Sequence, residues 1–119
     1  MVDMARKALE SLYTGTAVIA ELREVTKPNG AIGSEEVITA SDLPCRLSFG
    51  SSPSAVETDT AAGIAQEIKL FLAPEVRVKP GSRIEVTQNG VAAAYRSSGV
   101  PAIYSRHQEI NLTLFKKWG

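Results

Sequence analysis

Residues 83–96 read Arg-Ile-Glu-Val-Thr-Gln-Asn-Gly-Val-Ala-Ala-Ala-Tyr-Arg and contain the clearest fold signal in the chain. Ile84 and Val86 alternate with polar neighbours, as in a strand that buries one of its faces. The pair Asn89-Gly90 favours a two-residue hairpin turn, because both residues tolerate a positive φ. The stretch therefore predicts two antiparallel strands joined by a tight turn, with the return strand over residues 91–96.

Four further stretches alternate apolar and polar residues with the same period of two. The apolar residues that share a face in three of them are Leu43, Cys45, Leu47 and Phe49; Ile68, Leu70 and Leu72; and Ile110, Leu112 and Leu114. In the fourth, over residues 16–25, Val18, Ala20 and Leu22 share one face and Ile19 lies on the other. Such alternation is typical of half-buried antiparallel strands.

Turn residues separate these strands. Lys27-Pro28-Asn29-Gly30 predicts a turn after the first strand, because proline sets φ and Asn-Gly accepts a positive φ. A strand resumes over Glu36 to Ala40, which places the carboxylates of Glu35 and Glu36 in the tip of a long hairpin. We expect the run from Leu43 to Phe49 to form a separate strand after it.

About six short strands with turns between them indicate an all-β fold, either a small antiparallel β-barrel or a sandwich. We expect a single domain over residues 1–119, with the barrel in residues 14–119. Residues 1–13 form an N-terminal arm or a short helix, since their apolar residues recur at helical spacing.

One stretch lacks any sustained apolar period and predicts a long loop within the β-structure. Its residues are Gly50, Ser51, Ser52, Pro53, Ser54, Ala55, Val56, Glu57, Thr58, Asp59, Thr60, Ala61, Ala62, Gly63 and Ile64. Loops of this length in a compact domain are typically either functional or disordered. We therefore take residues 50–64 as a candidate to project from the barrel and contact a partner.

The composition argues against several classes of protein. The chain has 119 residues with 13 basic and 13 acidic side chains, so no positive excess favours nucleic-acid binding through counterion release. No apolar run approaches the ~20 residues of a membrane span, and the charges among residues 1–10 argue against a secretion signal. The single cysteine fits a soluble protein made in a reducing cytoplasm.

Few side chains are suited to catalysis. Cys45 is in phase with the apolar residues of its strand and is expected in the core, and His107, the one histidine, is expected at a solvated or interface position. Glu57 and Asp59 lack neighbours that would separate their pKa values. No phosphate-binding loop or Cys/His metal spacing is present. We expect no enzyme, metal or cofactor, and a Cys45–His107 catalytic pair is the one enzymatic alternative.

Six residues are candidates for contact with another subunit or partner: Leu9, Leu12, His107, Lys116, Lys117 and Trp118. Leu9 and Leu12 lie on the apolar stripe of the expected helix. Lys116 and Lys117 belong to a basic, amphipathic end, and Trp118 is the one tryptophan, a residue enriched among interface anchors. Packing of the stripe and of Trp118 onto their own domain is the alternative.

Two segments give the chain a resemblance to a known family. They are residues 73–86, APEVRVKPGSRIEV, and residues 95–112, YRSSGVPAIYSRHQEINL. Together with Leu43-Pro44-Cys45-Arg46-Leu47 before the expected loop, their order resembles the head-closure proteins of long-tailed bacteriophages. These are also called stopper, minor capsid or head-tail connector proteins. The likeness runs from Thr14 onward.

The resemblance implies a homo-oligomeric ring of β-barrels at the neck of the virion, assembled in the host cytoplasm and without contact with a membrane. Such a ring lies beneath the portal and adaptor proteins, retains packaged DNA without sequence specificity, and offers a docking surface to the tail. By position, residues 50–64 would be the loop that reaches toward the channel. There, Glu57 and Asp59 would repel the DNA phosphates.

Two other functions remain open. A tail-completion or adaptor protein occupies a neighbouring position in the same neck. A small-ligand or oligonucleotide-binding barrel belongs to a different class and predicts aromatic side chains grouped on one sheet face. Tyr95, Tyr104 and Phe115 show no such grouping in the sequence.

Overall fold

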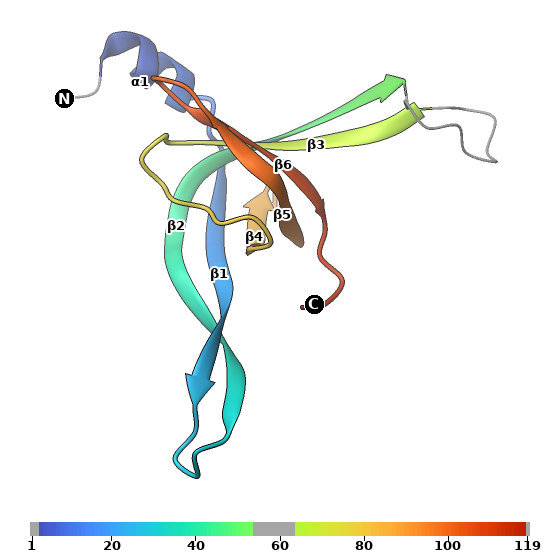
Figure 1. Ribbon diagram of the computed structural model, residues 1–119. Coiled ribbons are helices and arrows are strands. Elements are labelled where there is room, and N and C mark those ends of the chain that lie inside the picture. Colours follow the sequence, from blue (N-terminus) through green and yellow to red (C-terminus); the bar gives the residue numbers. More distant parts are fainter. Residues whose placement is uncertain (1–2, 54–63, 119) are drawn as a thin grey trace.

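The computed structural model describes residues 3–53 and 64–118 (Figure 1). Its elements in chain order are α1 (Met4–Glu10), β1 (Gly15–Thr26), β2 (Ile32–Pro53), β3 (Ile64–Leu72), β4 (Arg83–Gln88), β5 (Val91–Ile103) and β6 (Gln108–Leu114). Asp3 caps α1, because its carboxylate accepts a 2.7 Å hydrogen bond from the Arg6 amide. Within the two described ranges, no helix has the length and apolar character needed to cross a membrane.

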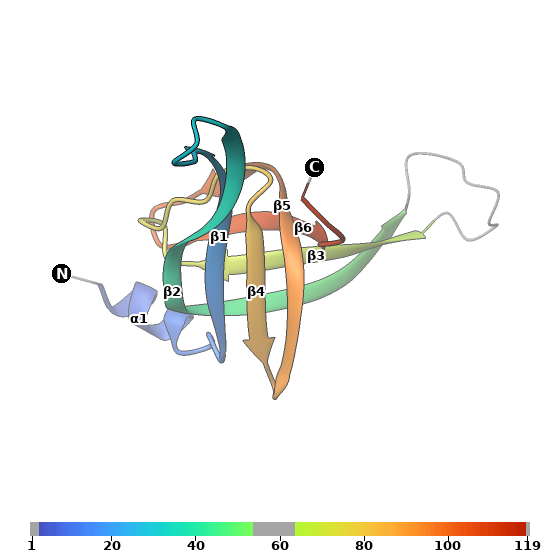
Figure 2. The same cartoon turned by 90° about the horizontal axis from the view of Figure 1, so that it is seen from below.

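The six strands close into one antiparallel barrel in the order β1-β2-β3-β6-β5-β4, as Figure 2 shows. The ladder between β1 and β4 joins the first strand to the fourth, and the ladder between β3 and β6 joins the third to the last. Because of these two ladders the strands form one closed sheet, whereas a sandwich would have two separate sheets stacked on each other. The prediction of an all-β fold is confirmed, and of the two architectures considered the barrel is the one that forms.

Apolar side chains from every strand fill the barrel. The positions predicted to face inward are buried at Cys45, Leu47, Leu70, Leu72, Ile84, Val86, Ile110 and Leu112. Phe49 and Leu114 were expected on the same faces but are 54% and 63% exposed. Each lies two residues beyond a buried leucine, Leu47 or Leu112, so the alternation continues past the part of the strand that the barrel covers.

The strict alternation predicted for the first strand is interrupted. Ala17, Ile19 and Ala20 are buried, so both predicted faces contribute to the core, whereas Leu22 is exposed. The β1–β2 register shifts between Ala17 and Ile19 and again between Ile19 and Ala20. A bulge of this kind resets the alternation along a strand, and sequence periodicity does not reveal where it occurs.

The hairpin predicted at Asn89-Gly90 is confirmed. Gln88 pairs with Val91, which leaves a two-residue turn between β4 and β5. Asn89 has a φ of 54° and Gly90 a φ of 77°, both in the left-handed region that a type I′ turn requires.

The two strands expected between Glu36 and Phe49 are one 22-residue strand, β2. Asp42, with a φ of 53°, lies where β2 passes from its pairing with β1 alone into the barrel. The placement of Glu35 and Glu36 in the hairpin tip is wrong, because Glu35 pairs with Arg23 and Glu36 with Leu22. The tip is formed by residues 27–31, where the Lys27 amide donates a 2.8 Å hydrogen bond to the carbonyl of Ala31.

The molecule is more extended than a compact domain of its length. Its radius of gyration is 16.7 Å, against about 13.5 Å for a compact chain of this size. Figure 1 shows the cause, because the ends of the β1–β2 and β2–β3 hairpins project from the barrel in different directions.

Candidate functional site

The outer part of the β1–β2 hairpin is a two-stranded ribbon without a third described strand paired beside it. The β1–β4 ladder ends at the pair Ala20–Arg83, and the β2–β3 ladder begins only at Cys45–Leu72. Among the described strands, residues 21–26 therefore pair only with β2, and residues 32–40 pair only with β1. We call this segment the β1–β2 ribbon.

The β1–β2 ribbon carries apolar side chains that the barrel does not cover. Leu22 is 42% exposed, Ile38 63% and Ile32 69%. Isolated two-stranded ribbons are marginally stable in water, and they gain stability when another surface covers their apolar residues. The ribbon therefore has both the free backbone edges and the apolar surface that a protein partner would cover.

A second ribbon is formed where a long loop was expected. Gly50 to Pro53 belong to β2 and Ile64 belongs to β3, and the two strands stay paired as far as Pro53–Ile64. The prediction of an irregular segment over residues 50–64 is therefore wrong at both of its ends. The loop was predicted because glycine and serine residues interrupt the apolar alternation there. Backbone pairing between the strands continues through these residues all the same. Residues 54–63, including Glu57 and Asp59, lie outside the described residues.

A groove of about 950 Å³ opens at the end of the barrel beside the β1–β2 ribbon. Its walls include Glu21 and Arg23 of the ribbon, the connection between β3 and β4 over residues 73–82, and Val100 and Ile103 near the end of β5. Val100 and Ile103 are 85% and 65% exposed. The groove is therefore bordered by apolar side chains as well as charged ones.

Gln108 holds the groove's β3–β4 connection in place. Its side chain is fully buried and its Nε2 atom donates hydrogen bonds of 2.7 and 2.6 Å to the carbonyls of Ala73 and Val76. The Gln108 Oε1 atom is buried without a hydrogen-bond partner. Two backbone carbonyls of a loop are thus satisfied by one side chain from β6, which fixes the wall of the groove to the barrel.

Charges alternate with apolar side chains along that wall. Val78 is buried and Val76 half-buried, whereas Glu75, Arg77 and Lys79 are exposed. The alternation in Glu-Val-Arg-Val-Lys was visible in the sequence, bracketed by Pro74 and Pro80, but no groove was predicted from it. The missing information was the position of the β1–β2 ribbon opposite this segment.

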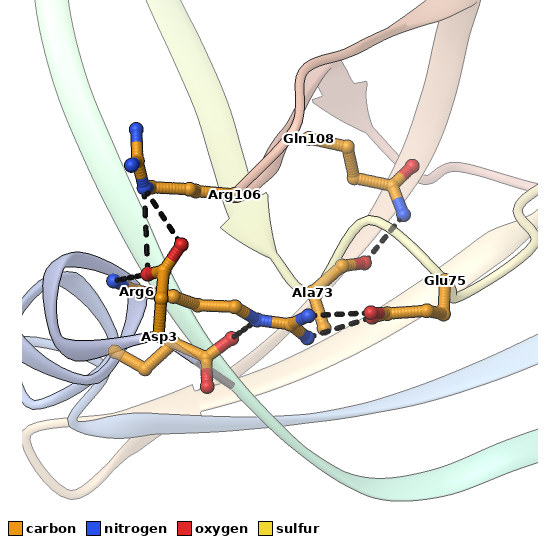
Figure 3. Close-up of polar contacts among 7 residues, drawn as sticks. Asp3, Arg6, Ala73, Glu75, Arg106 and Gln108 are labelled. Carbon is orange, nitrogen blue, oxygen red and sulfur yellow. Dashed lines mark hydrogen bonds and ion pairs between the residues drawn. The ribbon is translucent and has the colours of Figure 1, made fainter. Parts of the chain in front are cut away.

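Helix α1 lies against the outer side of the same connection through polar contacts (Figure 3). Arg6 donates hydrogen bonds of 2.5 and 2.7 Å to the Glu75 carboxylate and one of 2.9 Å to Glu10. Asp3 lies 3.3 Å from the Arg106 guanidinium. No residue of α1 is buried, so charge rather than apolar packing positions it.

These contacts shift the pKa values of the groups involved. The hydrogen bonds from Arg6 hold the pKa of Glu75 below its ordinary value, and they raise the pKa of the Arg6 guanidinium. The hydrogen bond from the Arg6 amide, with the nearby charge of Arg106, lowers the pKa of Asp3. All these groups are therefore charged at neutral pH.

The six residues predicted to contact a partner do not form one surface. Leu9 is half-buried and Leu12 is 52% exposed, both near the amino terminus, which Figures 1 and 2 place far from the carboxyl terminus. His107 stacks on Tyr104 with ring centroids 4.9 Å apart, and its Nε2 atom lies 2.9 Å from Glu109. Lys116 and Lys117 are exposed.

Trp118 contacts its own chain. Its ring lies edge-on to Phe115 at 5.1 Å, and its Nε1 atom donates a 3.3 Å hydrogen bond to Glu36 of the β1–β2 ribbon. With Leu22 it lines a smaller cleft of about 320 Å³. The carboxyl-terminal tail thus extends the apolar surface of the ribbon.

Cys45 and His107 occupy different environments. Cys45 is fully buried in the apolar core, where burial raises its thiol pKa to about 11, and His107 contacts aromatic residues and Glu109. Within residues 3–53 and 64–118, no group of three or more His, Cys, Asp or Glu side chains is arranged to hold a metal ion.

Comparisons with known proteins yield one similar structure. No protein-family model matches the chain, and no curated protein sequence matches it. The chain is similar in structure to the protein xkdH of the phage-like element PBSX from Bacillus subtilis, with a TM-score of 0.48 and 9% sequence identity. The alignment covers 83% of this chain and 91% of that one. At this level of similarity the match carries no argument about function.

Proposed function

We propose that the protein is a structural assembly subunit, without catalytic activity, whose surfaces are covered by neighbouring protein chains. The observation that carries this proposal is the β1–β2 ribbon, which extends from a closed barrel with exposed apolar residues and free backbone edges. Exposed ribbons are costly for a protein that remains alone, because they invite strand pairing and aggregation. A subunit that joins an assembly instead uses them as interfaces.

Within that class, we assign the protein to head closure in a long-tailed bacteriophage. This assignment rests on the resemblance of residues 73–86 and 95–112 to head-closure proteins, which implies a small β-barrel of the kind observed. The subunits would form a ring between the portal-side adaptor and the tail, around DNA that they contact without sequence specificity. The projecting β2–β3 hairpin occupies the chain position that the resemblance assigns to the channel.

Removal of the protein from the phage or prophage that encodes it tests this assignment. Heads assembled without it should package DNA, lose it again and remain without tails. Electron microscopy measures tail attachment, and nuclease-resistant DNA per head measures retention. Supplying the protein in trans is the control and should restore both. Particles that keep their DNA and carry tails without this protein would contradict the assignment.

The same experiment separates the nearest alternative. A tail-completion protein acts on the tail side, so its loss leaves heads that are closed and full. Tailless heads that retain their DNA would therefore move the assignment from head closure to tail completion, while the class of assembly subunit would stand.

A further inference from the structure

We propose that the groove of one copy of this chain binds the outward face of the β1–β2 ribbon of a second copy. The inference rests on the proposed assembly function and specifies which two surfaces join the subunits. The contact is heterologous, since a groove on one copy meets a ribbon on the next.

The strand register assigns the residues of the ribbon to two faces. Leu22 pairs with Glu36, and Thr26 pairs with Ile32, so the side chains of each pair share a face. Because successive residues alternate, Glu24 lies on that face too, which we call the outward face. Glu21 and Arg23 lie on the opposite face and line the groove of their own chain.

The outward face presents apolar surface that its own chain covers only in part, through the contact of Trp118 with Glu36 and the cleft that Trp118 lines with Leu22. Leu22, Ile32 and Ile38 are 42%, 69% and 63% exposed, and Ile38 joins this face through its pairing with Ala20. The groove presents the exposed apolar residues Val100 and Ile103 together with half-buried Val76. Contact between the two surfaces removes apolar area of both from water, which favours association.

The charges of the two surfaces are complementary. The outward face carries the carboxylates of Glu24 and Glu36. The groove has five charged side chains, of which Glu21 is paired with Arg23 and Glu75 with Arg6. The remaining two, Arg77 and Lys79, form no ion pair with any residue in the described part of the chain. Two unpaired positive charges thus border the groove, and two negative charges lie on the ribbon face that would enter it.

The outward face of the ribbon is opposite to the ribbon face that carries Glu21 and Arg23 and lines the groove. A copy that docks its outward face into a neighbour's groove therefore leaves its own groove open for the next copy. Repetition of such a contact produces a closed ring or an open filament rather than a dimer. A second copy of the chain is consequently the occupant that matches both the charge pattern and the proposed ring.

Charge reversal on each surface tests the proposal. The ribbon variant is Glu24→Lys with Glu36→Lys, the groove variant is Arg77→Glu with Lys79→Glu, and all four positions are exposed. Sedimentation and native mass spectrometry measure the size distribution up to about 1 mM chain, the range of weak contacts. Each variant should self-associate more than about a hundredfold more weakly than the wild type, because like charges then face each other.

Two mixtures make the result specific. The two variants combined should recover assembly, because each variant's ribbon matches the charges of the other variant's groove. The fourfold variant carrying all reversals should recover the wild-type assembly. Glu85→Lys, which makes the same charge change on β4, outside both surfaces, is the matched control and should assemble as the wild type does.

The ribbon of the groove variant fits the groove of the ribbon variant as in the wild type, and the two reversed surfaces fit each other. The equimolar mixture should therefore assemble beyond a dimer, with the two variants in strict alternation. Isotope labelling of one variant lets native mass spectrometry detect this alternation as equal numbers of the two chains.

Every outcome decides the proposal. A wild-type chain that stays monomeric up to about 1 mM would overturn it, and so would variants that assemble as the wild type does. Rings that form without regard to these four charges would leave the proposed head-closure function intact, because only the choice of surfaces would be wrong. Failure of the proposed function would have a different result: heads assembled without the protein would keep their DNA and carry tails.

Discussion

Arg6 of α1 and Glu75 of the β3–β4 connection, 69 residues apart in the sequence, are joined by hydrogen bonds of 2.5 and 2.7 Å. With the pair Asp3–Arg106, this contact holds a helix that has no buried residue. The helix is too short to be stable alone, so its structure depends on these charges.

Acid should release α1 before it unfolds the barrel. The pKa values of Asp3 and Glu75 lie below their ordinary values of 3.8 and 4.5, so the contacts contribute at neutral pH and are lost as the pH falls through the lowered pKa values. Hydrogen exchange of the α1 amides measures the release. Glu75→Gln should produce it at neutral pH, whereas Glu85→Gln, which removes the half-buried ion pair with Arg83 on β4, should leave α1 protected.

The thiol of Cys45 should react slowly with iodoacetamide in the native protein, at a rate limited by unfolding. Burial raises its pKa to about 11 from an ordinary value of 9.0, so the folded state favours the neutral thiol. Stability should consequently decrease as the pH rises from about 9 through about 11. Rapid labelling of the folded protein at pH 8 would contradict this account and restore Cys45 as a candidate nucleophile.

Gln108→Met should destabilise the protein by about 2 kcal/mol, because it leaves the carbonyls of Ala73 and Val76 without their buried donor. Gln108→Glu should cost more at pH 7, since an ionised carboxylate faces two carbonyls, and less near pH 4, where a protonated carboxyl can donate. Urea unfolding at both pH values measures the difference. Equal stability of the Glu variant at the two pH values, after correction for the wild type, would argue against this role.

Gly90→Ala should destabilise the protein by about 1 kcal/mol, because its φ of 77° is unfavourable for a residue with a Cβ atom. Among the described residues, none beyond the two chain neighbours of Gly90 has an atom within 4 Å of where a Cβ would lie, so the expected cost comes from the backbone and not from a clash. Asn89→Gly, which keeps a residue tolerant of positive φ in the same turn, is the control and should change the urea midpoint less.

Local patterns predicted most of the barrel. The alternation at Leu70/Leu72, Ile84/Val86 and Ile110/Leu112 identified inward-facing residues, because a strand that buries one face must repeat every second residue. The turn at Asn89-Gly90 was equally readable, since its chemistry is contained in two neighbouring residues.

The errors share a cause. The bulge near Ile19, the continuation of β2 beyond Gly50 and the placement of Glu36 beside Leu22 all depend on which strand pairs with which residue. Register is a relation between distant segments, and a shift of one residue moves every side chain to the other face.

The amino-acid sequence by itself determined the class of fold, the inward-facing residues of most strands and the tight turn, because each follows from interactions among near neighbours in the chain. Closure of the barrel, the groove and the meeting of Arg6 with Glu75 were decided only by the tertiary structure. Each requires segments tens of residues apart to lie together, and it is the strand register that brings them there.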